Sequence, residues 1–100
     1  MYKNRPKGGR NNIAGVNIER LRHGLYSEAT QRGPSQREFA EMLQRAGVDL
    51  DKNAIQRIES GKRFITDIEL KALAKVLHVT YDQLLKEEED EPLYEEIERL

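Results

Sequence analysis

Hydrophobic residues recur along the middle of the chain at the three- and four-residue spacings of an α-helix. Two sets have this spacing in full: Phe39, Met42, Leu43 and Ala46, and then Leu70, Leu73, Ala74 and Leu77. Because positions i, i+3, i+4 and i+7 lie on one side of a helix, each set predicts one buried stripe. Ile18, Leu21 and Leu25 indicate an earlier helix in the same way. No segment shows the strict alternation that predicts a β-strand.

Signals for helix starts agree with this periodicity. Three polar residues are each followed three positions later by Glu or Gln: Ser35 with Glu38, Thr66 with Glu69, and Thr80 with Gln83. This spacing is typical of a capping box, in which the two residues satisfy each other's free backbone donors. Gly47 and Gly61 stand where helices should end. The sequence therefore predicts an all-α protein with five helices at about 16–29, 35–46, 51–60, 66–77 and 80–88.

Length and composition favour a single small domain. The chain has 100 residues, of which 37% are hydrophobic, enough for one modest core. It contains no cysteine, which excludes disulfides and thiolate metal sites. No apolar run approaches the length of a membrane span, and the first residues lack the apolar stretch of a signal peptide. We expect a soluble, cytoplasmic protein.

The net charge of −1 hides an asymmetry along the chain. Residues 1–65 carry 13 Lys and Arg against 7 Asp and Glu, a balance of +6, whereas residues 66–100 carry 4 against 11, a balance of −7. A basic front half suits a surface that meets a polyanion. We expect residues 1–12 to be a basic flexible arm, residues 13–88 a folded domain, and residues 89–100 an acidic tail. A short helix in this tail would place Leu93, Ile97 and Leu100 on one side.

The predicted third helix has a distinctive outer face. At 100° per residue, Ala54, Ile55 and Ile58 lie on its inner side. The outer side carries amides, a hydroxyl and bases: Lys52, Asn53, Gln56, Arg57 and Ser60. Amide and guanidinium groups can bond the edges of DNA bases bidentately in the major groove. Taken alone, such a face is more often the solvated surface of a helix than a DNA contact.

The order of the elements favours the first interpretation. A capped amphipathic helix, a short connection, this polar-faced helix and a basic turn follow the plan of a helix-turn-helix unit. The segments "SQREFAEML", "AIQRIESGKR" and "LKALAKVLHVTYDQLL" resemble the Cro/cI-type, or XRE-type, helix-turn-helix regulators over about residues 16–86. This resemblance implies a five-helix, lambda-repressor-like DNA-binding domain.

The resemblance also assigns roles to individual residues. It implies that the following residues contact DNA: Gln36, Arg37, Lys52, Asn53, Gln56, Arg57, Ser60, Lys62 and Arg63. Gln36 would meet a phosphate or brace the recognition helix, and Lys62 and Arg63 would grip phosphates. Glu59 would pair with Arg22 on the first helix. The chain differs from the family pattern by three extra residues between Ala40 and Gly47 and two more before Ile55.

Two classes of function fit the sequence. The first is a transcriptional regulator, a repressor that binds double-stranded operator DNA as a homodimer, with Leu84, Leu85 and Tyr94 as candidate dimer contacts. The alternative is a helical protein-interaction module, or an antitoxin-like partner, that uses the acidic C-terminal segment. We expect no enzyme, cofactor or metal site, because His23 and His78 have no catalytic or metal-binding partner nearby in the sequence.

Overall fold

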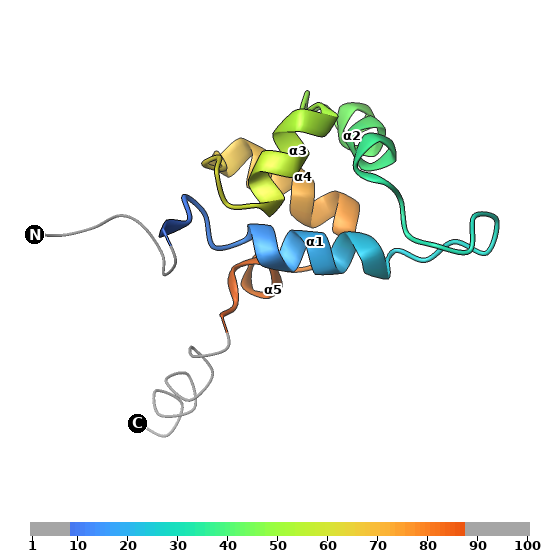
Figure 1. Ribbon diagram of the computed structural model, residues 1–100, viewed down its shortest axis with the longest axis horizontal. Helices are drawn as coiled ribbons and strands as arrows, with labels where there is room; N and C mark the ends of the chain where they lie inside the picture. Colours follow the sequence, from blue (N-terminus) through green and yellow to red (C-terminus); the bar gives the residue numbers. More distant parts are fainter. Residues whose placement is uncertain (1–8, 88–100) are drawn as a thin grey trace, which may run out of the picture.

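Five α-helices make up the domain: α1 (Gly15–Gly24), α2 (Gln36–Arg45), α3 (Lys52–Glu59), α4 (Asp67–Leu77) and α5 (Tyr81–Leu85) (Figure 1). The structure is a computed structural model, and it describes residues 9–87. These residues contain no β-strand, although Ser27 and Arg32 form an isolated β-bridge. The predicted all-α, five-helix class is therefore confirmed. The acidic tail at residues 89–100 lies outside the described residues.

The predicted helix starts are confirmed at α2, α4 and α5. Ser35, Thr66 and Thr80 are N-caps, and each forms the complete capping box with the Glu or Gln three residues on. A fourth cap was not predicted: the Asp51 carboxylate accepts a hydrogen bond of 2.8 Å from the Ala54 N–H at the start of α3. Four of the five helices thus begin at a side chain that satisfies their free backbone donors.

The predicted extent of the first helix was wrong. The helix ends at Gly24 and not at residue 29, and the chain then forms a turn in which the Ser27 N–H bonds the Arg32 carbonyl. Gly33 brings this loop back against α1, where an added Cβ would lie 2.6 Å from the Arg22 carbonyl oxygen. The predicted end of α5 also differs, because the helix ends at Leu85.

One hydrophobic core joins all five helices. Its fully buried side chains come from every helix: Ile18, Phe39, Leu43, Ile55, Ile58, Leu73 and Leu84. The burial of Leu84 corrects its assignment as a dimer contact, since it is 0% exposed within its own subunit. Among residues 9–87, no helix is long and apolar enough to cross a membrane.

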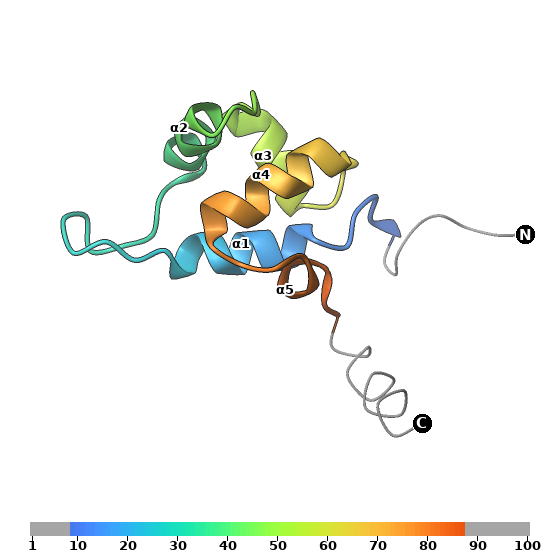
Figure 2. The ribbon, with the colours of Figure 1, turned by 180° about the vertical axis from the view of Figure 1, so that it is seen from behind.

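The arrangement of the helices separates two sides of the molecule. α2 packs against α3 and α4, and α1 packs against α3, α4 and α5. Figures 1 and 2 show α2 and α3 on one side of α1 and α5 on the other. The outer face of α3 and the short helix α5 therefore lie on different sides of the molecule.

Candidate nucleic-acid interface

Helix α3 presents one buried side and one exposed side. Ile55 and Ile58 are each 1% exposed and pack into the core. On the opposite side, the predicted reading residues are all exposed: Lys52, Asn53, Gln56, Arg57 and Ser60. Among residues 9–87, the side chains of Asn53, Gln56 and Arg57 have no hydrogen-bond or ion-pair partner. They are therefore available to a ligand outside the chain.

The turn from α2 to α3 is longer than in a typical member of the family, yet it is anchored at several points. Gly47 adopts a left-handed φ of +95°, a conformation that is strained for a residue with a side chain. The Val48 N–H bonds the Leu43 carbonyl at 3.0 Å. Leu50 is 3% exposed, so the turn also contributes to the core. With Asp51 capping α3, the added residues form a defined connection.

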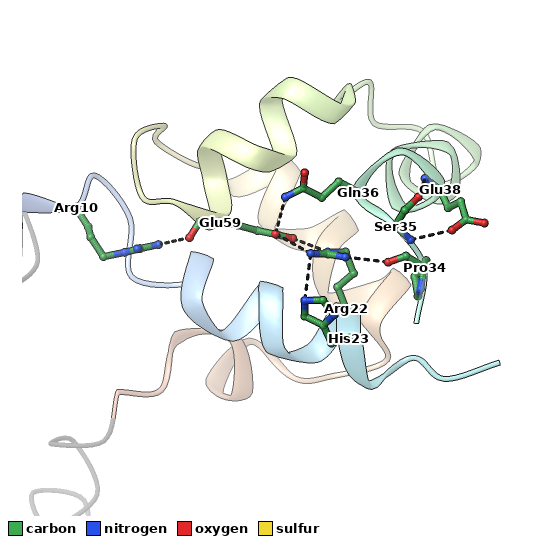
Figure 3. Close-up of polar contacts among 8 residues, drawn as sticks. All are labelled: Arg10, Arg22, His23, Pro34, Ser35, Gln36, Glu38 and Glu59. Atoms are coloured by element: carbon green, nitrogen blue, oxygen red, sulfur yellow. Dashed lines mark hydrogen bonds and ion pairs between the residues drawn. The ribbon is translucent and has the colours of Figure 1, made fainter. Parts of the chain in front are cut away.

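A buried ion pair joins α1 to α3 (Figure 3). Arg22 Nε lies 2.7 Å from Glu59 Oε2, and Arg22 Nη2 lies 3.0 Å from Glu59 Oε1. Arg22 and Glu59 are only 6% and 5% exposed. The guanidinium also donates from Nη1 to the Pro34 carbonyl at 2.9 Å, at the end of the loop between α1 and α2, and its Nη2 lies 3.5 Å from His23 Nε2. Glu59 therefore faces the protein interior and not the exposed side of α3.

The two candidate residues at the start of α2 differ in their surroundings. Gln36 Nε2 donates to Glu59 Oε1 at 2.9 Å, so Gln36 contacts the last residue of α3 (Figure 3). Of the two roles expected for Gln36, bracing α3 is the one for which the structure contains a contact. Arg37, the next residue, is exposed. Arg37 is thus the freer of the two to reach a ligand.

The basic turn after α3 contains two cations, of which Lys62 is exposed and Arg63 is paired with a carboxylate of its own chain. Gly61 adopts a left-handed φ of +82°, and Lys62 is exposed. The Arg63 guanidinium bonds both carboxylate oxygens of Glu69, at 2.8 and 3.0 Å. This contact lowers the pKa of the Glu69 carboxyl and raises the pKa of Arg63. Lys62 is therefore better placed than Arg63 to contact a phosphate.

Residues 10–12, which the sequence assigns to the flexible arm, lie against the end of α3 and the turn that follows it. The Arg10 guanidinium donates to the Glu59 carbonyl oxygen at 2.9 Å (Figure 3). Asn12 is 8% exposed and bonds the carbonyl oxygens of Ile58 and Arg63. Sequence reasoning missed these residues, because no local pattern connects them to partners nearly fifty positions away.

The candidate interface is an exposed helix face and not a cleft. A hollow of about 370 Å³ lies between the long loop, α2 and α4, but none of the candidate DNA-binding residues lines it. Within the described part of the chain, no group of three or more His, Asp and Glu side chains is arranged to hold a metal ion.

Comparison with protein families identifies a match over more than half of the chain. Residues 26–84 match the model of a helix-turn-helix family, a segment that includes the whole of α2, α3 and α4. Neither the curated proteins nor the solved structures contain a match to this chain.

Proposed function

The chain belongs to the Cro/cI-type helix-turn-helix family of DNA-binding, non-enzymatic proteins, and on this premise we propose that it is a sequence-specific transcriptional regulator that reads the major groove with α3. The observation that carries this proposal is the outer face of α3, where the side chains of Asn53, Gln56 and Arg57 are exposed and form no hydrogen bond or ion pair within residues 9–87. Amide and guanidinium side chains without partners are suited to bonding base edges.

The dimensions of α3 support the proposal. An α-helix with its side chains is about 10–12 Å in diameter, close to the width of the major groove of B-DNA, so the eight residues of α3 can lie within it. The amides of Asn53 and Gln56 match the N6 and N7 groups of adenine, and the guanidinium of Arg57 matches O6 and N7 of guanine. Lys52 and Ser60 lie at the two ends of this face and contact bases or the backbone.

Contacts with the DNA backbone surround this reading face. Lys62 lies in the turn after α3 and Arg37 lies in the first turn of α2, so we assign both to phosphates. Arg63 adds a smaller contribution, because Glu69 already holds its guanidinium. Gln36 acts through Glu59. Backbone contacts of this kind provide affinity, whereas the α3 amides provide specificity.

We further propose that the protein is a repressor and binds a two-fold operator as a homodimer. Helices α1 and α5 pack against each other and carry exposed hydrophobic side chains: Val16 on α1, and Tyr81 and Leu85 on α5, which are 56%, 49% and 36% exposed. A symmetric contact between copies would cover them. Leu85 remains from the predicted dimer contacts, and Tyr94 lies outside the described residues.

The test of DNA reading is selection of bound sequences from a random double-stranded pool, followed by fluorescence anisotropy at several salt concentrations. We expect a preferred sequence with two related half-sites, and affinity that falls steeply with salt because bound counterions are released. Retention that is independent of sequence and salt would contradict the proposal and favour the protein-interaction module.

The test of the dimer and of repression uses two further measurements. The mass in solution of the full chain, of Leu85→Glu and of a chain without residues 91–100 shows whether α5 and the acidic tail hold two copies together. A reporter gene placed behind the selected operator should be silenced by the full chain and released by Leu85→Glu. A monomeric full chain that silences the reporter equally well would contradict the dimer.

A further inference from the structure

Three consecutive residues before α1 bond the backbone carbonyls at the end of α3 and in the basic turn. We name Arg10, Asn11 and Asn12 the carbonyl clamp. Its contacts are Arg10 Nη2 to the Glu59 oxygen (2.9 Å), the Asn11 N–H to Gly61 (2.7 Å), Asn11 Nδ2 to Lys62 (3.0 Å), and Asn12 Nδ2 to Ile58 (3.0 Å) and Arg63 (2.7 Å). Five carbonyls between residues 58 and 63 thus accept hydrogen bonds from the clamp.

The end of α3 has a physical need for such contacts. The last carbonyls of a helix have no partner within it, and they form the negative end of the helix dipole. The Arg10 guanidinium provides both a donor and a positive charge at this point. The clamp therefore stabilises the last turn of a recognition helix that is only eight residues long.

Two glycines allow the clamp to come this close. A Cβ on Gly61 would lie 2.6 Å from Cζ of Arg10, and a Cβ on Gly15 would lie 2.1 Å from the Ile58 carbonyl oxygen. The Gly15 N–H also donates to Asn12 Oδ1 at 2.8 Å, which holds the buried amide in position. The first turn of α1, the clamp and the end of α3 are consequently packed as one unit.

We propose that the carbonyl clamp is a positioning element for DNA binding, which places Lys62 against a phosphate without contacting DNA through Asn11 or Asn12. The proposal rests on the proposed DNA-binding function. Lys62 is exposed and its side chain has no partner among residues 9–87, so the position of its backbone sets the region that the flexible side chain can reach with its ammonium group. The clamp bonds the carbonyl of Lys62 itself and those of both neighbours.

The test substitutes the uncharged clamp residues. An asparagine neutralises no phosphate, so its loss does not directly change the number of counterions released on DNA binding. We compare Asn12→Ala and Asn11→Ala with Asn17→Ala. Asn17 is a matched control, since its amide also bridges two carbonyls, of Leu84 and Lys86, both at 2.8 Å, but next to α5. The slope of log affinity against log salt is measured for each variant, and circular dichroism shows that each is folded at the assay temperature.

We expect both clamp variants to bind more weakly and to lose up to about 0.9 of salt slope, the amount that one phosphate contact contributes, whereas Asn17→Ala keeps the slope of the original chain. In a Lys62→Ala background, the clamp substitutions should change the slope no further. Should Asn12→Ala not fold, the less buried Asn11→Ala carries the same comparison.

Two results would overturn the inference in different ways. An unchanged slope in both clamp variants, while Lys62→Ala lowers it, refutes the clamp and leaves the DNA-binding function intact. A full chain whose binding to the selected operator does not depend on salt refutes the proposed function itself, and the clamp with it.

Discussion

Arg22 and Glu59 lie 37 positions apart in the chain and form a buried ion pair, with Arg22 Nε 2.7 Å from Glu59 Oε2. Gln36 adds a third donor to the same carboxylate, so α1, α2 and α3 meet at one group. A carboxylate removed from water is tolerated only when such donors surround it. The pair thereby turns the last residue of the recognition helix toward the protein interior.

Removing one partner of this pair should destabilise the fold strongly. Arg22→Met leaves the Glu59 carboxylate buried without its cation, and we expect a loss of about 3–5 kcal/mol in the free energy of unfolding, measured by urea denaturation. Arg32→Met is the control, because it breaks an exposed pair with Glu38 that contributes little. Equal losses in the two variants would contradict the structural role of the buried pair.

Reversing the charge of Lys62 should weaken DNA binding without changing its specificity. Lys62→Glu removes a phosphate contact, so affinity should fall by a similar factor for every sequence and the salt slope should decrease by about 1. Fluorescence anisotropy on the selected operator and on unrelated DNA measures both effects. Lys71→Glu on α4, an equally exposed position, is the control for the change in net charge. The assignment fails if the two variants behave alike.

Substituting the amides of α3 should change specificity without changing the fold. Asn53→Ala and Gln56→Ala remove exposed side chains, and each should lose about 1–3 kcal/mol of discrimination at particular operator positions if its contact is bidentate. A base-substitution profile of the operator for each variant identifies those positions. Gln44→Ala, an exposed amide on α2, should leave the profile unchanged. A uniform shift at every position would show that other residues read the bases.

Glycine in place of His78, at the end of α4, should stabilise the protein. His78 has a left-handed φ of 57°, a conformation that costs a side-chain-bearing residue about 1–2 kcal/mol. His78→Gly should therefore stabilise the protein by about 0.5–1 kcal/mol, after the greater freedom of glycine in the unfolded chain is subtracted. Gly47→Ala, at a φ of +95°, should have the opposite effect. Thermal unfolding of both variants tests the pair, and a destabilised His78→Gly would show that the imidazole has a role of its own.

Acid should weaken the start of α2. Hydrogen bonds to Arg32, and then to Ser35, lower the pKa of the Glu38 carboxyl to about 2 from an ordinary value of 4.5. Because the folded-state pKa lies below the unfolded one, this carboxylate makes a small contribution to stability above pH 4.5, which solvent screens at this exposed pair, and the contribution is lost as the pH falls from there to about 2. The melting temperatures of the original chain and of Glu38→Gln should differ above pH 5 and converge toward pH 2. Curves that stay parallel across this range would contradict the prediction.

The sequence by itself determined the helices, because their signals are local. Ser35, Thr66 and Thr80 each meet a partner only three residues away, and the spacing of Ile55 and Ile58 already placed one side of α3 in the core. An exposed face of amides and bases follows directly from that spacing. The family resemblance rests on the same local patterns, and the match to residues 26–84 confirmed it.

Only the tertiary structure decided which distant groups meet. The sequence predicts that Arg10 and Asn12 belong to a flexible arm, because this segment lacks apolar side chains. In the structure they bond backbone carbonyls at the end of α3 and in the turn after it, 46 to 51 positions away, and these bonds hold the clamp in place. Gly33 closes the loop that ends α1 early, and Leu84 fills a core assembled from all five helices. The physical reason is that every residue has the same backbone carbonyl, so the sequence does not show which carbonyl a distant side chain bonds. That contact is known only from the folded structure.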